Sequence, residues 1–135
     1  MKKIKAVLLI DDDEPTTFIN KKIIQSSGLI DTIHTANSGR EALNFLSHTN
    51  NPVNEPPTPD LILLDINMPA MDGWEFLTEY KKIKNTQTKP IVIVMLTTSL
   101  NPDDEMKANE IKEVHGFKNK PLTKQMLEDI VIKFF

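Results

Sequence analysis

The sequence predicts an α/β protein, a three-layer sandwich in which helices cover both faces of a five-stranded parallel sheet. Short apolar runs of strand length alternate with stretches in which apolar residues recur at helical spacing, and this alternation indicates repeated βα units. The run at 91–96 is apolar throughout, as expected for a strand that is buried on both faces. With right-handed crossovers, the strand order expected for this arrangement is 2-1-3-4-5.

The first half of the chain contains three predicted strands and two predicted helices. The strands are expected at about 5–10, 32–36 and 61–65. The first helix begins near Pro15, which suits a first helical turn, and ends at Gly28. The second begins at Ser38-Gly39-Arg40-Glu41, in which a serine cap precedes a glutamate by three positions. Residues 47–59 carry four prolines and are expected to form an extended surface loop. Helical spacing in the first helix is shown by its apolar positions Phe18, Ile19, Ile23 and Ile24.

The second half continues the alternation. Two strands are expected at about 91–96 and 114–119. A helix follows Asp72-Gly73, because apolar and aromatic residues then recur every three to four positions. Asn101 caps a helix that has Pro102 in its first turn and ends near Ile111. Thr123 caps the last helix, whose inward positions are Leu127, Ile130, Val131 and Phe134.

Composition limits the classes of protein that this chain can represent. It has 135 residues, of which 39% are hydrophobic and 26% charged, as in one globular domain with an ordinary core. The net charge is −3 and there is no long basic run, so we expect neither nucleic acid nor a membrane as a partner. There is no cysteine, which excludes thiolate metal sites and cysteine nucleophiles. The apolar start leads into aspartates rather than a cleavage site, and we expect a cytoplasmic protein.

Polar residues stand at the ends of four predicted strands. They are Asp11 and Asp12 after the first strand, Asp65 at the end of the third, Thr97 and Thr98 after the fourth, and Lys120 after the fifth. The carboxyl ends of parallel strands share one edge of the sheet, where such sheets bind ligands. Carboxylate oxygens suit Mg²⁺, and a carboxylate can accept a phosphoryl group as an aspartyl phosphate. A hydroxyl and an ammonium nearby would neutralise the phosphoryl oxygens.

Four segments resemble the response-regulator receiver domains of two-component signalling, in particular the single-domain chemotaxis-type receivers. They are Ile10-Asp11-Asp12, Asp65-Ile66-Asn67-Met68-Pro69-Ala70-Met71-Asp72-Gly73, Leu96-Thr97-Thr98-Ser99 and Gly116-Phe117-Lys118-Asn119-Lys120-Pro121. They occur in the family's order, each at a predicted strand end, and the resemblance covers nearly the whole chain. It implies the flavodoxin-like fold and a single receiver domain over 1–135, with no output domain.

The resemblance also implies how the acidic residues act. Asp65 accepts a phosphoryl group from a phosphohistidine on a sensor histidine kinase. Mg²⁺ is the implied cofactor, and Asp12 and Asp65 are its direct ligands. The backbone carbonyl of Asn67 completes the protein ligands, and Asp11 acts through water.

A second group of residues is implied to respond to the phosphoryl group. Thr97 turns its hydroxyl toward it, and Lys120 pairs first with the acidic residues and then with the phosphate; the bond Lys120-Pro121 is expected to be cis. The ring of Phe117 moves inward when Thr97 moves, which changes the face formed by the last two helices and the strand between them. Thr98 and Ser99 are expected to modulate the site.

Three functions fit these residues to different degrees. The preferred one is a stand-alone response regulator that binds a downstream protein partner, as a monomer or as a phosphorylation-dependent homodimer. A phosphorelay intermediate that passes the group to a histidine phosphotransfer protein is the alternative. A Mg²⁺-dependent phosphatase is disfavoured, because haloacid-dehalogenase-type enzymes carry an acidic residue two positions after the nucleophile, where this chain has Asn67. We therefore expect no enzyme acting on other substrates, but a signalling protein that catalyses its own phosphorylation and dephosphorylation.

Overall fold

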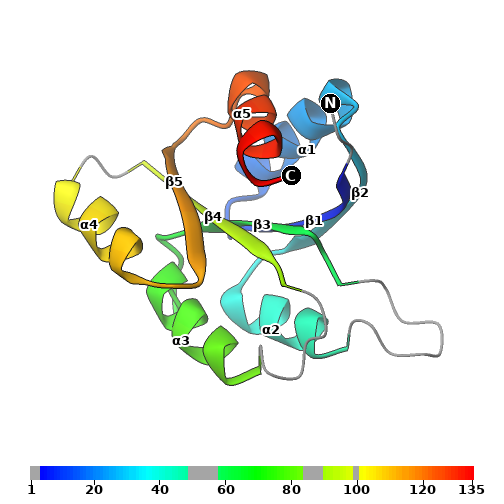
Figure 1. The fold of residues 1–135 in the computed structure, drawn as a ribbon. Helices are drawn as coiled ribbons and strands as arrows, with labels where there is room; N and C mark the ends of the chain where they lie inside the picture. Colours follow the sequence, from blue (N-terminus) through cyan, green and yellow to red (C-terminus); the bar gives the residue numbers. More distant parts are fainter. Residues whose placement is uncertain (1–3, 49–57, 84–89, 99–100) are drawn as a thin grey trace.

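The computed structural model describes residues 4–48, 58–83, 90–98 and 101–135, which contain five strands and five helices in alternation (Figure 1). The strands are β1 (Ile4–Ile10), β2 (Ile30–Ala36), β3 (Leu61–Asp65), β4 (Val92–Thr97) and β5 (Val114–Asn119). The helices are α1 (Glu14–Ser27), α2 (Gly39–Ser47), α3 (Gly73–Ile83), α4 (Pro102–Glu110) and α5 (Lys124–Phe134). Every element predicted from the sequence is present, in the predicted order.

The strands form one parallel sheet with the order β2-β1-β3-β4-β5. Helices α1 and α5 cover one face, and α2, α3 and α4 lie on the other (Figure 1). These observations confirm the three-layer, flavodoxin-like fold. None of the helices in the described part of the chain combines the length and apolar character needed to cross a membrane.

Alternate side chains of the inner strands pack into two cores, one on each face of the sheet. Leu8 and Ile62 belong to the core under α2, α3 and α4. Leu9 and Leu63 belong to the core under α1 and α5. Side chains of a strand alternate between its two faces, so both sets must be apolar when both faces are covered. This explains the continuous apolar runs in the sequence.

The ends of the helices follow local capping rules. The side chain of Asp13 caps α1, which begins at Glu14, so Pro15 lies in the first turn as predicted. Gly28 ends α1 in the left-handed conformation with φ 69°, which glycine adopts without steric cost. The hydroxyl of Ser38 accepts the backbone N–H of Glu41 at 3.0 Å, which confirms the predicted cap of α2.

Only some of the apolar positions that indicated α1 face the core. Ile24 is fully buried and Asn20 is 5% exposed, whereas Phe18 and Ile19 are 62% and 53% exposed. The buried positions are four residues apart, one helical turn along the same side. Phe18 precedes Asn20 by two residues, which places it on nearly the opposite side of the helix, so helical spacing alone does not show which apolar positions face inward.

Three strands differ from their predicted bounds. β1 begins at Ile4, one residue earlier than expected. β2 begins at Ile30, two residues earlier than expected, because Ile30 pairs with Ile4 of β1. β4 is shifted by one residue and ends at Thr97, which pairs with Asn119 of β5. Of the proline-rich segment 47–59, residues 49–57 lie outside the described residues.

Candidate functional site

The register of the sheet places the predicted polar residues at one edge. Ile10 of β1 is aligned with Leu64 of β3, so Asp11 follows β1 at the level where Asp65 ends β3. On the other side of β3, Asp65 is aligned with Leu96 of β4. The ends of three neighbouring strands therefore meet at the carboxyl edge of the sheet, where parallel sheets bind ligands.

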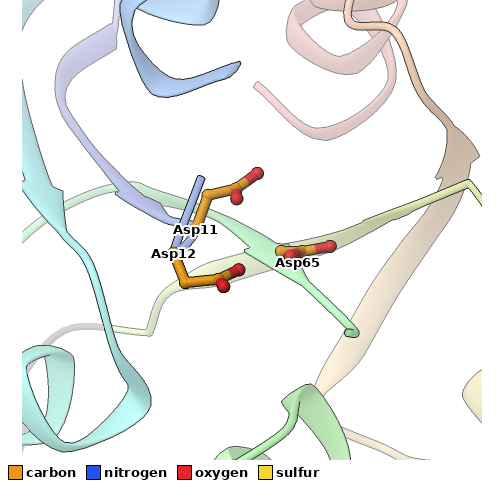
Figure 2. A group of neighbouring side chains, drawn as sticks. All are labelled: Asp11, Asp12 and Asp65. Atoms are coloured by element: carbon orange, nitrogen blue, oxygen red, sulfur yellow. The ribbon is translucent and has the colours of Figure 1, made fainter. Parts of the chain in front are cut away.

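Three carboxylates gather at this edge. One oxygen from each of Asp11, Asp12 and Asp65 lies within 4.8 Å of the others (Figure 2). Asp11 and Asp65 are only 6% and 5% exposed, whereas Asp12 is exposed. In Figure 2 the carboxylate of Asp12 points toward that of Asp65. Like charges this close repel one another strongly where water is scarce, so the cluster requires positive charge.

Lys120, which follows the edge strand β5, supplies part of that positive charge. Its Nζ lies 2.8 Å from Oδ2 of Asp11 and 3.0 Å from Oδ1 of Asp65. Its backbone N–H donates to the carbonyl of Thr97 at 2.8 Å, and its bond to Pro121 is cis, as predicted. The lysine is thus held at the end of β4 and bridges the two buried carboxylates.

The charges shift one another in opposing ways. Burial raises the pKa of Asp65, and the neighbouring Asp11 raises it further, against the bond from Lys120 and the backbone N–H of Asn67. Burial by itself lowers the pKa of Lys120, but its bonds to Asp11 and Asp65 outweigh burial, so the pKa lies above the ordinary value. Lys120 is therefore an ammonium at neutral pH. The charge of Asp65 is only partly compensated, which favours a further cation.

The segment after Asp65 returns directly to the start of α3. The backbone N–H of Gly73 donates to the carbonyl of Ile66 at 2.8 Å, and Ala70 has a positive φ of 66°. Asp72 caps α3 by accepting the N–H of Glu75 at 2.9 Å. The sequence predicted a helix start here, but it gave no signal for the conformation of Ala70 or for how closely Gly73 approaches Ile66.

The remaining predicted residues lie around this center. Thr97 is fully buried at the end of β4, and Thr98 is exposed beside it. Ser99 lies outside the described residues. Asn67 is exposed in the segment after β3, and Phe117 is partly buried against the core under α2, α3 and α4.

A hollow of about 270 Å³ opens beside Lys120, between α1 and the segment that follows β5. Ile19 and Asn20 of α1 line it together with Thr98 and Pro121. The exposed Ile19 gives the acidic site an apolar neighbour at the surface. The sequence indicated Ile19 only as an apolar position of a helix, because spacing does not show which side of a helix is covered.

The fold and this edge of charged residues together define a receiver domain of two-component signalling. The family model described as response regulator receiver domain matches residues 7–132, and the chain belongs to that family. Members of the family bind a divalent metal and interact with histidine kinases and downstream partners.

Individual relatives agree with this assignment. The chain is 35% identical over 107 residues to response regulator Rcp1 of Synechocystis sp., covering 79% of this chain and 71% of that protein. A crystal structure of a two-component response regulator from Cytophaga hutchinsonii superposes with a TM-score of 0.88 and 33% identity, covering 98% of this chain and 97% of that one. The Mn²⁺-bound form of Rcp1 superposes with a TM-score of 0.74 and 30% identity, covering 96% and 94%.

A further relative is a larger protein. The chain is 31% identical over 125 residues to sensor histidine kinase CheAY of Helicobacter pylori, which is 93% of this chain but 14% of that protein. A receiver of this kind can therefore be one part of a kinase as well as the main part of a small regulator.

Proposed function

We propose that this chain acts as a stand-alone response regulator, a single receiver domain that takes a phosphoryl group onto Asp65 and responds by binding another protein. The observation that supports this most directly is the position of Asp65, buried at a strand end beside two other carboxylates and bridged by Lys120. A site that only bound a metal ion would not need Lys120 between its two buried carboxylates, and a simple ion pair would not need a second carboxylate. A phosphoryl group on Asp65 would use both the lysine and the buried hydroxyl of Thr97.

The phosphoryl donor in this proposal is the phosphohistidine of a sensor histidine kinase. An oxygen of the Asp65 carboxylate forms a bond to phosphorus while the bond between phosphorus and the imidazole nitrogen breaks. That nitrogen keeps the electron pair and takes up a proton, so a neutral histidine leaves. Lys120 then transfers one of its contacts from Asp65 to a phosphoryl oxygen, and Thr97 offers its hydroxyl to another.

The acidic cluster fits a divalent cation, and we propose Mg²⁺. The donors are hard oxygens within 4.8 Å of one another, as Mg²⁺ prefers, and the similar Rcp1 structure holds Mn²⁺. Asp12 and Asp65 would hold the ion directly with the carbonyl of Asn67, and Asp11 through water. When bound, the ion supplies positive charge to the phosphoryl oxygens.

The output surface in this proposal is the face of α4, β5 and α5. Thr97 ends β4 beside β5, and Phe117 of β5 is partly buried beneath that face. A shallow hollow of about 220 Å³ lies there and includes Glu105, Phe117 and Lys133 in its lining. Movement of Thr97 toward the phosphoryl group would let the ring of Phe117 turn inward and change the shape of this hollow. Thr98 and Ser99 would modulate how long the phosphoryl group remains.

Incubation with acetyl phosphate and Mg²⁺, followed by intact-protein mass spectrometry, tests the acceptor. The protein is expected to gain one phosphoryl group, and Asp65→Asn to gain none, because an amide is a poor nucleophile. Asp60→Asn is the matched control: Asp60 lies at the opposite end of β3 and binds the backbone N–H groups of Lys5 and Ala6, so labelling should persist. Labelling of Asp65→Asn at the rate of the parent protein would contradict the proposal.

A further inference from the structure

We propose that Gly73, the first residue of α3, is a positioning residue for the acidic site. Because it has no side chain, α3 can start directly against the backbone of Asp65 and Ile66. This contact holds the phosphoacceptor and the neighbouring Asn67 where the site needs them. The inference rests on the proposed function, since it concerns the same site.

The space around Gly73 shows how close this approach is. A Cβ atom there would lie 2.9 Å from the carbonyl oxygen of Asp65, 2.9 Å from Cα of Ile66 and 3.2 Å from Cε of Met95. The first two separations are shorter than real Cβ contacts allow. Both involve backbone atoms, so the clash can be relieved only by moving α3 away or by moving the end of β3.

The same residue closes the segment that carries Asn67. The backbone N–H of Gly73 donates to the carbonyl of Ile66 at 2.8 Å, and Ile66 is 3% exposed in the core. The N–H of Asn67 in turn bonds to the Asp65 carboxylate. Through these two hydrogen bonds, a displacement of Gly73 would also move the backbone of Asn67 and its contact with Asp65. Sites that depend on precise geometry lose function when their groups move by fractions of an ångström.

The chain contains a matched control at the start of α2. Gly39 is buried and follows the cap Ser38, just as Gly73 is buried and follows the cap Asp72. A Cβ at Gly39 would meet Sδ of Met71 at 2.6 Å and its Cγ at 3.0 Å. These atoms belong to a flexible side chain that is partly exposed, so they can move aside without shifting backbone.

Two measurements on Gly73→Ala and Gly39→Ala test the inference. Calorimetric titration with Mg²⁺ is expected to show binding at least about tenfold weaker in Gly73→Ala, and within about twofold of the parent in Gly39→Ala. Without any cation, the backbone amide NMR signals of Asp65, Ile66 and Asn67 are expected to move in Gly73→Ala and to stay in place in Gly39→Ala. Equal effects of the two substitutions on both measurements would overturn the inference.

A second variant separates backbone contact from core packing. Met95→Leu removes the terminal methyl group that a Cβ at Gly73 would meet, at little cost in packing. Added to Gly73→Ala, it is expected to recover thermal stability but to leave Mg²⁺ binding weak, since the backbone contacts remain. If Gly73→Ala alone does not fold, the double variant is compared with Gly39→Ala in its place. Recovery of Mg²⁺ binding in the double variant would show that packing against Met95, not the Asp65 backbone, is responsible, and would refute the inference.

The outcomes also distinguish the inference from the proposed function. A parent protein that binds no Mg²⁺ and takes no phosphoryl group contradicts the proposed function. The amide signals of Asp65, Ile66 and Asn67 still decide whether Gly73 positions this backbone, because they need no cation. Unmoved signals in Gly73→Ala refute the inference even when the parent protein is phosphorylated.

Discussion

The positions of some single residues could be predicted from the sequence, and those of others could not. Asp11, Asp65 and Lys120 were predicted to meet because each stands at the carboxyl end of a predicted strand, and the ion pairs of Lys120 at 2.8 and 3.0 Å confirm that they do. For residues at strand ends, the order of the strands in the sheet is enough to predict which of them are neighbours in space. The closeness of Gly73 to the Asp65 backbone could not be predicted, because it depends on the angle at which α3 meets the sheet.

His34 is a second residue whose surroundings the sequence did not reveal. It lies in β2 with its ring centroid 4.8 Å from that of Phe45 in α2. Its Nε2 is buried and has no hydrogen-bond partner among the described residues. Burial lowers the pKa of His34 below its ordinary value of 6.5, because a charged imidazole loses hydration there.

This burial predicts how the stability of the protein depends on pH. Below about pH 6.5 the unfolded chain binds a proton at His34 that the folded protein does not yet bind, so the free energy of unfolding falls as the pH falls. One proton contributes at most about 1.4 kcal/mol per pH unit. Urea unfolding at a series of pH values from about 7.5 to 5 is expected to show a shallower slope for His34→Phe than for the parent protein.

Phe45→Ala is the comparison for this experiment. It keeps His34 but removes the ring that covers it, so its pH slope is expected to lie between those of the parent protein and His34→Phe. If His34→Phe retained the full slope of the parent protein, other groups would be responsible for the pH dependence.

At the scale of the elements, α4 is the least firmly packed of the helices. Among its described residues only Ala108 is buried. Lys107 reaches across to α3 and lies 4.6 Å from the centroid of the Trp74 ring, a contact that stabilises by a modest amount at an exposed site. Elements with few buried apolar contacts open at a lower free energy than the core. Such loose packing is what we expect of α4 if, as proposed, the face of α4, β5 and α5 changes shape on phosphorylation.

Removing the N-terminal cap of α4 or of α5 tests whether α4 opens more easily than α5. The side chain of Asn101 accepts the N–H of Asp103 at 3.0 Å at the start of α4, and Thr123 accepts the N–H of Met126 at 3.1 Å at the start of α5. In Asn101→Ala, the amides of α4 should exchange with deuterium about fivefold faster, the equivalent of about 1 kcal/mol.

Thr123→Ala is the matched removal of a cap. Helix α5 buries Leu127, Ile130 and Val131, so losing its cap is expected to lower the global free energy of unfolding by about 1 kcal/mol. Exchange in α4 should stay at the parent rate. Faster exchange throughout the molecule in Asn101→Ala would show that α4 does not open separately.

The boundaries of the elements show where sequence reasoning was sufficient. The bounds of β3 and β5 and the caps of α2, α4 and α5 were predicted, because turn and cap residues act on their near neighbours. The start of β2 was not predicted, since Ile30 joins the strand by pairing with the distant Ile4. The inward side of α1 could not be predicted for a related reason, because packing against α5 and the sheet decides which of its apolar residues are covered.

At the scale of the whole molecule, the sheet separates two cores that have no side chain in common within the described part of the chain. Ile62 lies in the core under α2, α3 and α4, and Ile130 in the core under α1 and α5. Both are almost fully buried, at 0% and 1% exposure. A single cooperative unfolding transition is expected, because the backbone of the sheet belongs to both layers.

Removing one methyl group from each core tests this arrangement. Ile62→Val and Ile130→Val are each expected to lower the free energy of unfolding by about 0.5–1.5 kcal/mol. The double variant should equal the sum of the two within about 0.5 kcal/mol, since the sites have no shared partner. Urea unfolding followed by circular dichroism measures all three variants. A second transition in any of them would show that the two layers unfold separately.

The direction of the strands has a consequence for how this protein can change over generations. All five strands point the same way, so every segment that leads from a helix into a strand joins the sheet at the end away from Asp65. Insertions or deletions there alter the length of the chain without altering the distances among Asp11, Asp65 and Lys120. At the carboxyl end, Gly73 is held in close contact with the backbone of Asp65 and Ile66, so a change in length between Asp65 and Gly73 would have to leave that contact in place. The segments at one end of the sheet can thus vary in length without moving the acidic site, while the segment from β3 to α3 at the other end is tied to that site by backbone contact.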